Sequence, residues 1–538
     1  MKNSLTCIAL IGTLALATTA RAQEEEDYRA QAVAAEKAGE FSRAADLFRL
    51  LIDAGSEDKE ILMAATRCME QASRFGDALD VLDEARAIFP DDLAFGVTMA
   101  KILVLKAEKQ LAEGGQMDMY VASDYQEAAA IAEEVLEADS NNRDARLIAA
   151  NSYFTVGEWD KARPHAEILV QESPDHPGGH IMLADLAFEQ FKALTAAAAE
   201  EEEEEAKETT LRAQAALAVA EQSYSKALEL DDQRIVAHRK LGDVYAWMGD
   251  TEKVLAKYRD ALLIDPYAPV MHEWIASSVP PEDRFAYYEK VGKEYLERPN
   301  IDKRNAGLFA WHAAQALTAM SEFKRAEGFY EMVVELNPTF HSAYYYAMNS
   351  AWFFRSDEDA ALDYAYKYAQ NAPIEFADVV KSIPTEDDRK QVTQLVAYLA
   401  KRAMDKNYLS HCRDLNHVLA AIVDTADAWN NYAFMARDTQ RYDESETAYR
   451  HALAIEPGSG QLMNDLAVIL DIHRDNRVSA LAEAKQLYED ALAIGQAQLA
   501  EEGLSDDDRA GAELTIKDST DNLATLKRKY ERLGIEWS

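Results

Sequence analysis

The chain has 538 residues, of which 48% are hydrophobic and 28% are charged, so it can bury a sizeable core and is not broadly disordered. Alanine, leucine and glutamate dominate while glycine (21) and proline (13) are few, which predicts an all-α protein. The formal net charge of −40 disfavours binding to nucleic acids and to anionic membrane surfaces. The charge either serves solubility alone, which is the simpler interpretation, or also attracts basic segments of other proteins or divalent cations.

Residues 1–22 have the three-part layout of a secretory signal peptide. Lys2 precedes a mainly apolar run over residues 5–17, and the small residues Ala20 and Ala22 stand at the cleavage-determining positions. The run is too short for a comfortable membrane span, and no other apolar run approaches that length. We therefore expect an exported protein, periplasmic or secreted, without an integral membrane span.

The stretch 235–268 shows the clearest local pattern and serves as the reference repeat. It predicts two helices with apolar residues at helical spacing, a tight reversal at Gly249, and an end marked by Pro266. Gly242 and Ala261 are small where the two backbones would approach most closely. This pattern resembles one tetratricopeptide repeat (TPR), a helix–turn–helix unit of about 34 residues.

The same pattern recurs along the chain in constant phase, which a chance match would not keep. We therefore predict a right-handed α-solenoid of TPR units, with about six of them in an N-terminal solenoid over residues 23–268. The other units that fit the reference repeat are 25–58, 59–92, 143–176, 307–340, 341–374 and 426–459.

Two repeats of the N-terminal solenoid are interrupted, with inserts at 104–127 and 190–219. The second insert contains four alanines followed by the run Glu200–Glu205. Because alanine and glutamate favour helix, both inserts are predicted to lengthen a helical hairpin rather than to form a loop. We interpret the six-glutamate run as a solvated acidic arm in preference to a cation site.

The remaining chain departs from the reference repeat twice. The proline pair Pro269 and Pro280 is mirrored by Pro373 and Pro384, each 104 residues later, which favours a duplicated module over two independent helix starts. The predicted organisation is a proline-broken irregular unit at 269–306, a regular TPR pair at 307–374, an irregular helical unit at 375–425, a TPR pair at 426–497, and a capping helix within 498–538.

No motif of catalysis or metal binding stands out. The chain lacks a nucleotide-binding glycine loop, a nucleophile elbow and an HExxH motif. His176 and His180 are separated by Pro-Gly-Gly and cannot share one helical face, so we predict no metal site there. Cys68 and Cys412 lie far apart inside helical patterns and are expected to be small buried side chains. We predict no catalytic residue and no cofactor.

The resemblance implies binding positions instead. In TPR proteins the first helix of each unit lines the concave face, which would bring together amides that hold a peptide backbone and aromatic rings that supply apolar area. The same side chains would suit a sugar ring, or they could pack against neighbouring helices. The positions carried over are Asn151, Phe154, Trp311, Gln315, Tyr345, Asn349, Trp352, Asn430 and Phe434.

We therefore expect an exported TPR scaffold that binds other proteins and has no catalysis of its own. The alternatives are a structural component of a cell-envelope or surface assembly, and a non-catalytic subunit or glycan-binding partner of an exported enzyme.

Overall fold

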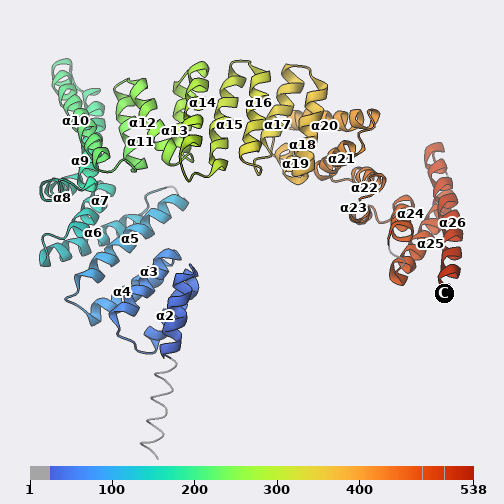
Figure 1. Cartoon of the computed structure of the whole chain (residues 1–538), viewed down its shortest axis with the longest axis horizontal. Helices are drawn as coiled ribbons and strands as arrows, with labels where there is room; N and C mark the ends of the chain where they lie inside the picture. The colour runs from blue at the N-terminus through green and yellow to red at the C-terminus, as the bar shows by residue number, and fades with distance from the viewer. Residues whose placement is uncertain (1–24, 115, 475–476, 502, 538) are drawn as a thin grey trace, which may run out of the picture. The chain divides into compact units, whose positions relative to one another are not determined.

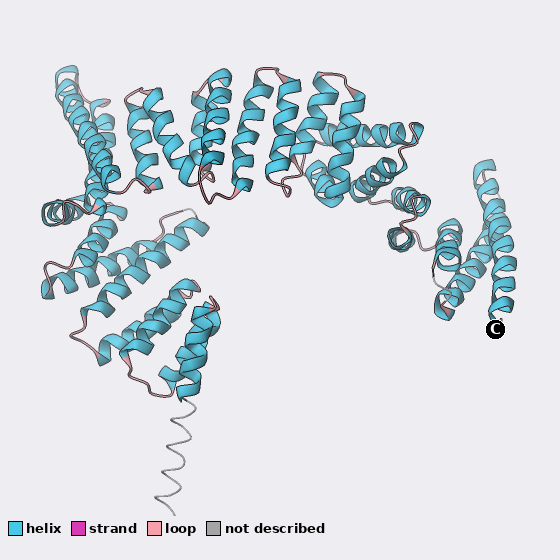
Figure 2. Cartoon of the chain, viewed as in Figure 1, coloured by secondary structure: helices cyan, strands magenta, loops and turns pink. Residues whose placement is uncertain are grey.

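The computed structural model describes residues 25–114, 116–474, 477–501 and 503–537. The described residues are 82% helical and contain no strand. The helices form successive antiparallel hairpins (Figures 1 and 2), which confirms the predicted all-α repeat fold. The predicted signal peptide at 1–22 lies outside the described residues.

The chain divides into two compact units. Unit 1 comprises residues 1–264 and unit 2 comprises residues 265–538. The described part of unit 1 consists of a helix over residues 25–37, α2 (Phe41–Asp53), α3 (Lys59–Gln71), α4 (Phe75–Ile88), α5 (Leu93–Gly114), α6 (Met119–Ala138), α7 (Arg143–Thr155), α8 (Trp159–Glu172), α9 (Pro177–Ala198), α10 (Glu203–Leu230), α11 (Ile235–Trp247) and α12 (Thr251–Ile264).

Helix α3 shows how the sequence specifies a regular repeat helix. The Asp58 side chain accepts a hydrogen bond from the backbone N–H of Glu60 at 2.8 Å and so caps the first turn. Leu62, Ala65 and Met69 follow at spacings of three and four, and all three are fully buried. Burial of each large apolar side chain contributes about 1.5–3 kcal/mol, so the stack gains most of its stability from this face.

The two inserts lengthen helical hairpins, as the sequence predicts. Helices of regular repeats such as α3 and α4 have 13 and 14 residues. In contrast, α5 and α6 have 22 and 20, and α9 and α10 have 22 and 28. Helix α10 begins with Glu203, Glu204 and Glu205 in its first turn, where the partial positive charge of the helix N-terminus stabilises carboxylates.

Unit 2 contains α13 (Pro269–Ser278), α14 (Pro281–Glu297), α15 (Lys303–Ala319), α16 (Phe323–Leu336), α17 (Ala343–Asn349), η1 (Ser350–Phe354), α18 (Glu358–Asn371), α19 (Pro373–Lys381), α20 (Glu386–Asp405), α21 (Leu409–Val423), α22 (Ala426–Asp438), α23 (Tyr442–Ile455), α24 (Gly460–Val468), η2 (Ile469–His473), α25 (Val478–Leu499) and α26 (Asp506–Leu533). The short helices α13 and α19 both begin with a proline and are both followed by a longer helix. The order of helices thus repeats together with the proline positions.

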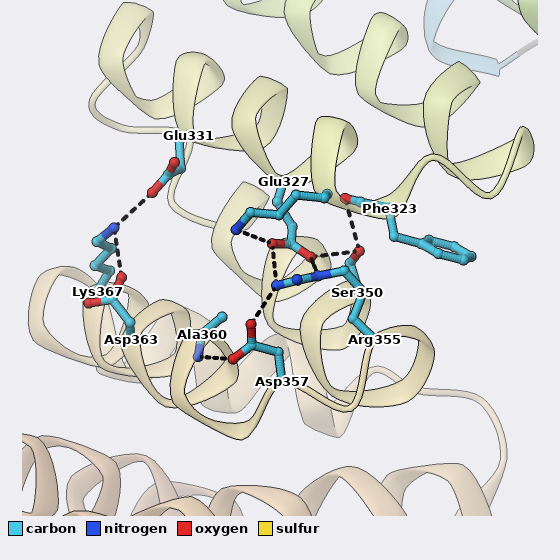
Figure 3. A network of polar contacts seen from close by, with 10 residues as sticks. Phe323, Glu327, Glu331, Ser350, Arg355, Asp357, Ala360, Asp363 and Lys367 are labelled. Carbon is cyan, nitrogen blue, oxygen red and sulfur yellow. Dashed lines mark hydrogen bonds and ion pairs between the residues drawn. The ribbon is translucent and has the colours of Figure 1, made fainter.

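The repeat at 341–374 departs from the regular geometry that its sequence predicts. Its first helix, α17, has only seven residues and continues as the π-helical turn η1. After this turn Arg355 reaches the fully buried carboxylate of Glu327 on α16, with Nε–Oε1 and Nη2–Oε2 distances of 2.6 and 3.0 Å. Ser350 donates a third hydrogen bond to the same carboxylate at 3.3 Å, as Figure 3 shows. The irregular turn therefore lets one buried ion pair join two repeats.

The last helix fits the predicted capping role, although its start differs from the predicted boundary. Helix α25 continues to Leu499, and α26 begins at Asp506 after Ser505, whose hydroxyl accepts from the backbone N–H of Asp508 at 3.1 Å. Helix α26 buries Leu526 and Tyr530 against the preceding helices, and most of its other residues are exposed. It covers the last apolar face of the stack with a polar surface.

Candidate binding grooves

Each unit contains a groove of the same construction. Both lie between the first helices of two successive helical hairpins, and the second helix of the earlier hairpin forms the floor. We call the groove between the helix over 25–37 and α3 the N-groove, with α2 as its floor and a volume of about 570 Å³. We call the groove between α20 and α22 the C-groove, with α21 as its floor and a volume of about 480 Å³.

The N-groove combines an apolar floor with a charged rim. Phe48 of α2 lies at its base with 1% of its surface exposed. The cations of the rim are already paired: Arg29 with Asp58 at 3.0 Å and with Glu60 at 3.1 Å. The other two rim cations are paired as well, Arg67 with Glu36 at 2.7 Å and Lys59 with Asp92.

The C-groove has a more apolar lining. Met404 of α20 and Phe434 of α22 form its walls, with 41% and 42% of their surfaces exposed. Cys412 and Met435 lie at the base, each 3% exposed. Burial raises the pKa of the Cys412 thiol, while a hydrogen bond from Asn416 opposes the shift. The thiol is therefore a neutral part of the floor rather than a nucleophile.

Two amides and one cation complete the C-groove. Asn416 Nδ2 donates to the carbonyl oxygen of Cys412 at 2.8 Å, so its own amide oxygen can still accept a hydrogen bond. Asn431 and Lys401 are both exposed and line the groove. In the described part of the chain, neither side chain has an ion-pair or hydrogen-bond partner.

Most predicted site residues of the repeats at 307–374 pack against the core. Trp311 is half-buried and lies 5.1 Å from Phe340 and 4.8 Å from Tyr346 between ring centroids. Trp352 is half-buried against Tyr398, with the ring centroids 5.2 Å apart. These tryptophans contribute apolar contacts between helices and present only part of their surface to solvent.

The amides and the tyrosine of the same predicted set are also half-buried. A hydrogen bond joins Asn349 to the Tyr345 hydroxyl, and burial raises the pKa of that tyrosine. The Asn349 side-chain oxygen is buried and has no hydrogen-bond partner among the residues that the structure describes. Gln315 is half-buried on α15.

The other predicted positions divide between the two units. In unit 1, Asn151 and Phe154 are half-buried on α7, and Phe154 packs against the buried cluster that includes Ala162 and Met182. In unit 2, Phe434 lines the C-groove, whereas the half-buried Asn430 does not.

The sequence pattern missed the α20 side of the C-groove. Residues 375–425 do not follow the reference repeat. The binding positions, which are numbered from the start of a regular repeat, therefore could not be assigned in this segment. Ala397, Lys401 and Met404 nevertheless recur at spacings of four and three on α20, which places them on one helical face. A search for helical faces independent of the repeat register would have found them.

A cluster of two buried rings and one half-buried ring lies outside the grooves, on α13, α14 and α15. The Tyr288 hydroxyl and His272 Nδ1 are 2.9 Å apart, and the His272 and His312 rings stack with centroids 4.0 Å apart. His272 Nε2 lies 3.0 Å from the carbonyl oxygen of Pro266, so it donates and the hydroxyl donates to Nδ1. Burial lowers the pKa of both histidines, and for His312, where neighbouring His272 adds to the shift, to about 3.

A cluster of metal ligands and a membrane-spanning helix are both absent from the described ranges. No cluster of three or more histidine, cysteine, aspartate or glutamate side chains there is arranged to hold a metal ion. None of the helices in those ranges has both the length and the apolar character that a membrane span requires. His176 accepts from the backbone N–H of Gly178 at 3.2 Å and caps α9, and His180 bonds the carbonyl oxygen of Pro174 at 3.0 Å.

Comparisons with known proteins identify the repeats. Residues 29–92 and 121–186 match family models described as tetratricopeptide repeat. No curated protein sequence matches the chain significantly. The chain therefore contains tetratricopeptide repeats.

Three solved structures illustrate the structural likeness. YrrB, a TPR protein with an unusual peptide-binding site, is 17% identical with a TM-score of 0.28, over 42% of this chain and 96% of that chain. A MamA fragment from Desulfovibrio magneticus RS-1 is 15% identical with a TM-score of 0.27, over 39% of this chain and 98% of that chain. A monomeric IFIT1 mutant with m7Gppp-AAAA is 17% identical with a TM-score of 0.34, over 62% of this chain and 68% of that chain.

Proposed function

We propose that this protein is a TPR scaffold that binds segments of other proteins in the N-groove and the C-groove and performs no catalysis itself. The observation that carries the proposal is the recurrence of one construction, a hollow between successive first helices, in both units. TPR proteins generally mediate protein–protein interactions, and the two hollows supply a place for such binding.

The size and lining of the grooves suit a short peptide segment. Ligand sites commonly span about 300–1,000 Å³, and both grooves lie within that range. Phe434 and Met404 expose apolar area that a partner would bury, at about 1.5–3 kcal/mol for each side chain that becomes fully covered. Such a contact is modest by itself, so two grooves on one chain would strengthen binding to a partner that engages both.

The half-buried aromatic and amide residues of α15, α17 and η1 form the competing surface. A partner could instead contact the exposed edges of Trp311 and Trp352. We favour the grooves because both tryptophans already pack against other rings. Trp311 contacts Phe340 and Tyr346, and Trp352 contacts Tyr398, so less of their surface is available to a partner.

Site-specific photo-crosslinking in the full-length protein tests the proposal. A benzophenone amino acid at Met63 or Asn431 would place the reactive group in the N-groove or the C-groove, and one at Ile455 serves as a control. Ile455 is 43% exposed on α23 and does not line either groove. We expect cross-links to defined segments of partner proteins from the groove positions and not from Ile455.

Substitutions then assign the captured contacts. Phe434→Asp should abolish cross-linking from the C-groove, whereas Ile455→Asp, which adds the same charge at equal exposure, should leave it intact. If cross-linking is instead lost in the Trp311→Ala/Trp352→Ala variant and kept in Phe434→Asp, the groove assignment is wrong. A purified protein that turns over a substrate by itself would contradict the scaffold role.

We also propose that the chain acts after export, as a periplasmic or secreted protein. The support is the signal-like layout of residues 1–22. Expression of the full chain followed by mass spectrometry of the N-terminus tests this. A mature protein that begins at Gln23 is the expected result, and retention of residues 1–22 would contradict export by this route.

A further inference from the structure

We propose that the C-groove selects segments in which an apolar side chain is flanked by carboxylates. The proposal rests on the binding function proposed above and specifies the chemistry of the segment. The overall charge of −40 suggests basic partners, but the local lining of this groove points the other way. Lys401 is the charged residue of its lining, and no carboxylate takes part in that lining.

Lys401 differs from the other cations at the C-terminal end of α20. Arg402 pairs with Asp359 at 2.8 Å and also with Glu358, and Lys406 pairs with Asp359 at 2.5 Å. Lys401, which lines the groove, has no ion-pair partner within the described ranges of the chain. Its ammonium group is therefore available to a carboxylate of a bound segment, and such contacts are favourable when the pair is partly desolvated.

The apolar parts of the lining define where the segment's anchor would lie. Met404 and Phe434 face the groove from α20 and α22, and Leu419 and Met435 lie between them. A leucine or phenylalanine of the partner would be enclosed by these four side chains. Lys401 is one helical turn before Met404, so a carboxylate near the anchor would meet the ammonium group.

Two amides are placed to hold the backbone of the segment. The side-chain N–H of Asn416 donates to the carbonyl oxygen of Cys412. The side-chain oxygen of Asn416 can therefore accept a hydrogen bond from a peptide N–H. Asn431, exposed on the opposite wall, supplies both a donor and an acceptor. The groove thus provides an apolar pocket, a positive charge and amide contacts, a combination matched by an extended acidic segment with an apolar anchor.

The N-groove lacks this preference. Its three cations are already paired with carboxylates, so a partner carboxylate would have to displace an existing ion pair. The proposal therefore concerns the C-groove alone.

Three fluorescein-labelled peptides of about ten residues test the inference on the full-length protein. The peptides share a central Leu-Phe anchor and carry aspartate, lysine or serine at the flanking positions. We expect the aspartate peptide to bind most tightly in fluorescence anisotropy at low salt, by severalfold over the serine peptide. An exposed ion pair contributes about 0.2–1 kcal/mol, which corresponds to at most about fivefold per contact. The preference should decrease in high salt.

Charge substitutions on α20 identify the responsible residue. Lys401→Glu should reverse the preference between the aspartate and lysine peptides, and Lys401→Met should remove it. Lys390→Glu is the matched control, because Lys390 is an exposed lysine of the same helix outside the groove lining and the net charge changes equally. Circular dichroism verifies that each variant keeps its helical content.

The outcomes separate the inference from the proposed function. If the lysine peptide binds the native protein as tightly as the aspartate peptide, or Lys390→Glu acts like Lys401→Glu, the acidic preference is wrong. Loss of that binding in Phe434→Asp would then still support the groove itself. If none of the three peptides shows binding that depends on Phe434, both the preference and the binding function of this groove fail.

Discussion

Replacing Arg355 with methionine should destabilise the region of α16–α18 by about 3–5 kcal/mol. Methionine keeps an unbranched apolar chain but removes the guanidinium group that faces Glu327, whose side chain is fully buried. Two charge-assisted hydrogen bonds at 2.6 and 3.0 Å are lost, and a buried carboxylate keeps only Ser350 and the peripheral Lys324. Breaking a buried pair by removing one partner typically costs about this much, because the remaining charge stays desolvated.

Hydrogen exchange measured by mass spectrometry is the appropriate assay, since repeat arrays need not unfold in a single two-state transition. Faster exchange in Arg355→Met should be centred on peptides of α16, η1 and α18. Lys324→Met is the control: its ammonium lies 3.4 Å from the same carboxylate, but its side chain is 69% exposed, so the change should stay below about 1 kcal/mol. A loss of less than about 1 kcal/mol in Arg355→Met would refute the reasoning that this ion pair joins the two repeats.

Two further predictions concern pH and glycine positions. Because folding lowers the pKa of His272 and His312, the unfolded state binds more protons below about pH 6.5, so unit 2 should lose stability as the pH falls from there toward 3. His312→Gln should flatten this slope in urea unfolding measured between pH 7 and 4, and an unchanged slope in that variant would contradict the assignment to His312. Gly242→Ala should cost about 1–3 kcal/mol, because the new Cβ would lie 2.4 Å from the tyrosine ring of α12. Gly328→Ala, within α16 and with open space around the new methyl group, should stabilise by about 0.5–1 kcal/mol. If the urea midpoint of unfolding shifts in the same direction in both glycine variants, the packing argument is wrong.

The repeat pattern predicted helices well where it kept its register. The reference repeat over 235–268 forms α11 and α12, and Gly242, which the sequence predicts to lie where the two helices pack closely, faces the side-chain ring of Tyr258. The lengthened hairpins also followed from composition, because alanine-rich and glutamate-rich inserts continue a helix without needing a new core.

The candidate site was less predictable, for a physical reason. A repeat position states which helical face a residue occupies, but the exposure of that residue depends on the size of its neighbours. Trp311 occupies a predicted binding position and is covered by the aromatic rings of Phe340 and Tyr346. Phe434 occupies another predicted binding position, on α22, and remains exposed on a groove wall.

The sequence by itself determined the all-α class, the repeat unit and the lengthened hairpins, since these depend on local spacing and helix propensity. Only the tertiary structure decided where the grooves lie and which charged side chains have no ion-pair partner among the described residues. Lys401 and Lys406 look alike in sequence, yet Lys406 is paired with Asp359 of α18 and Lys401 faces the C-groove without an ion-pair partner among the described residues. That difference depends on contacts between residues more than forty positions apart, which no local pattern encodes.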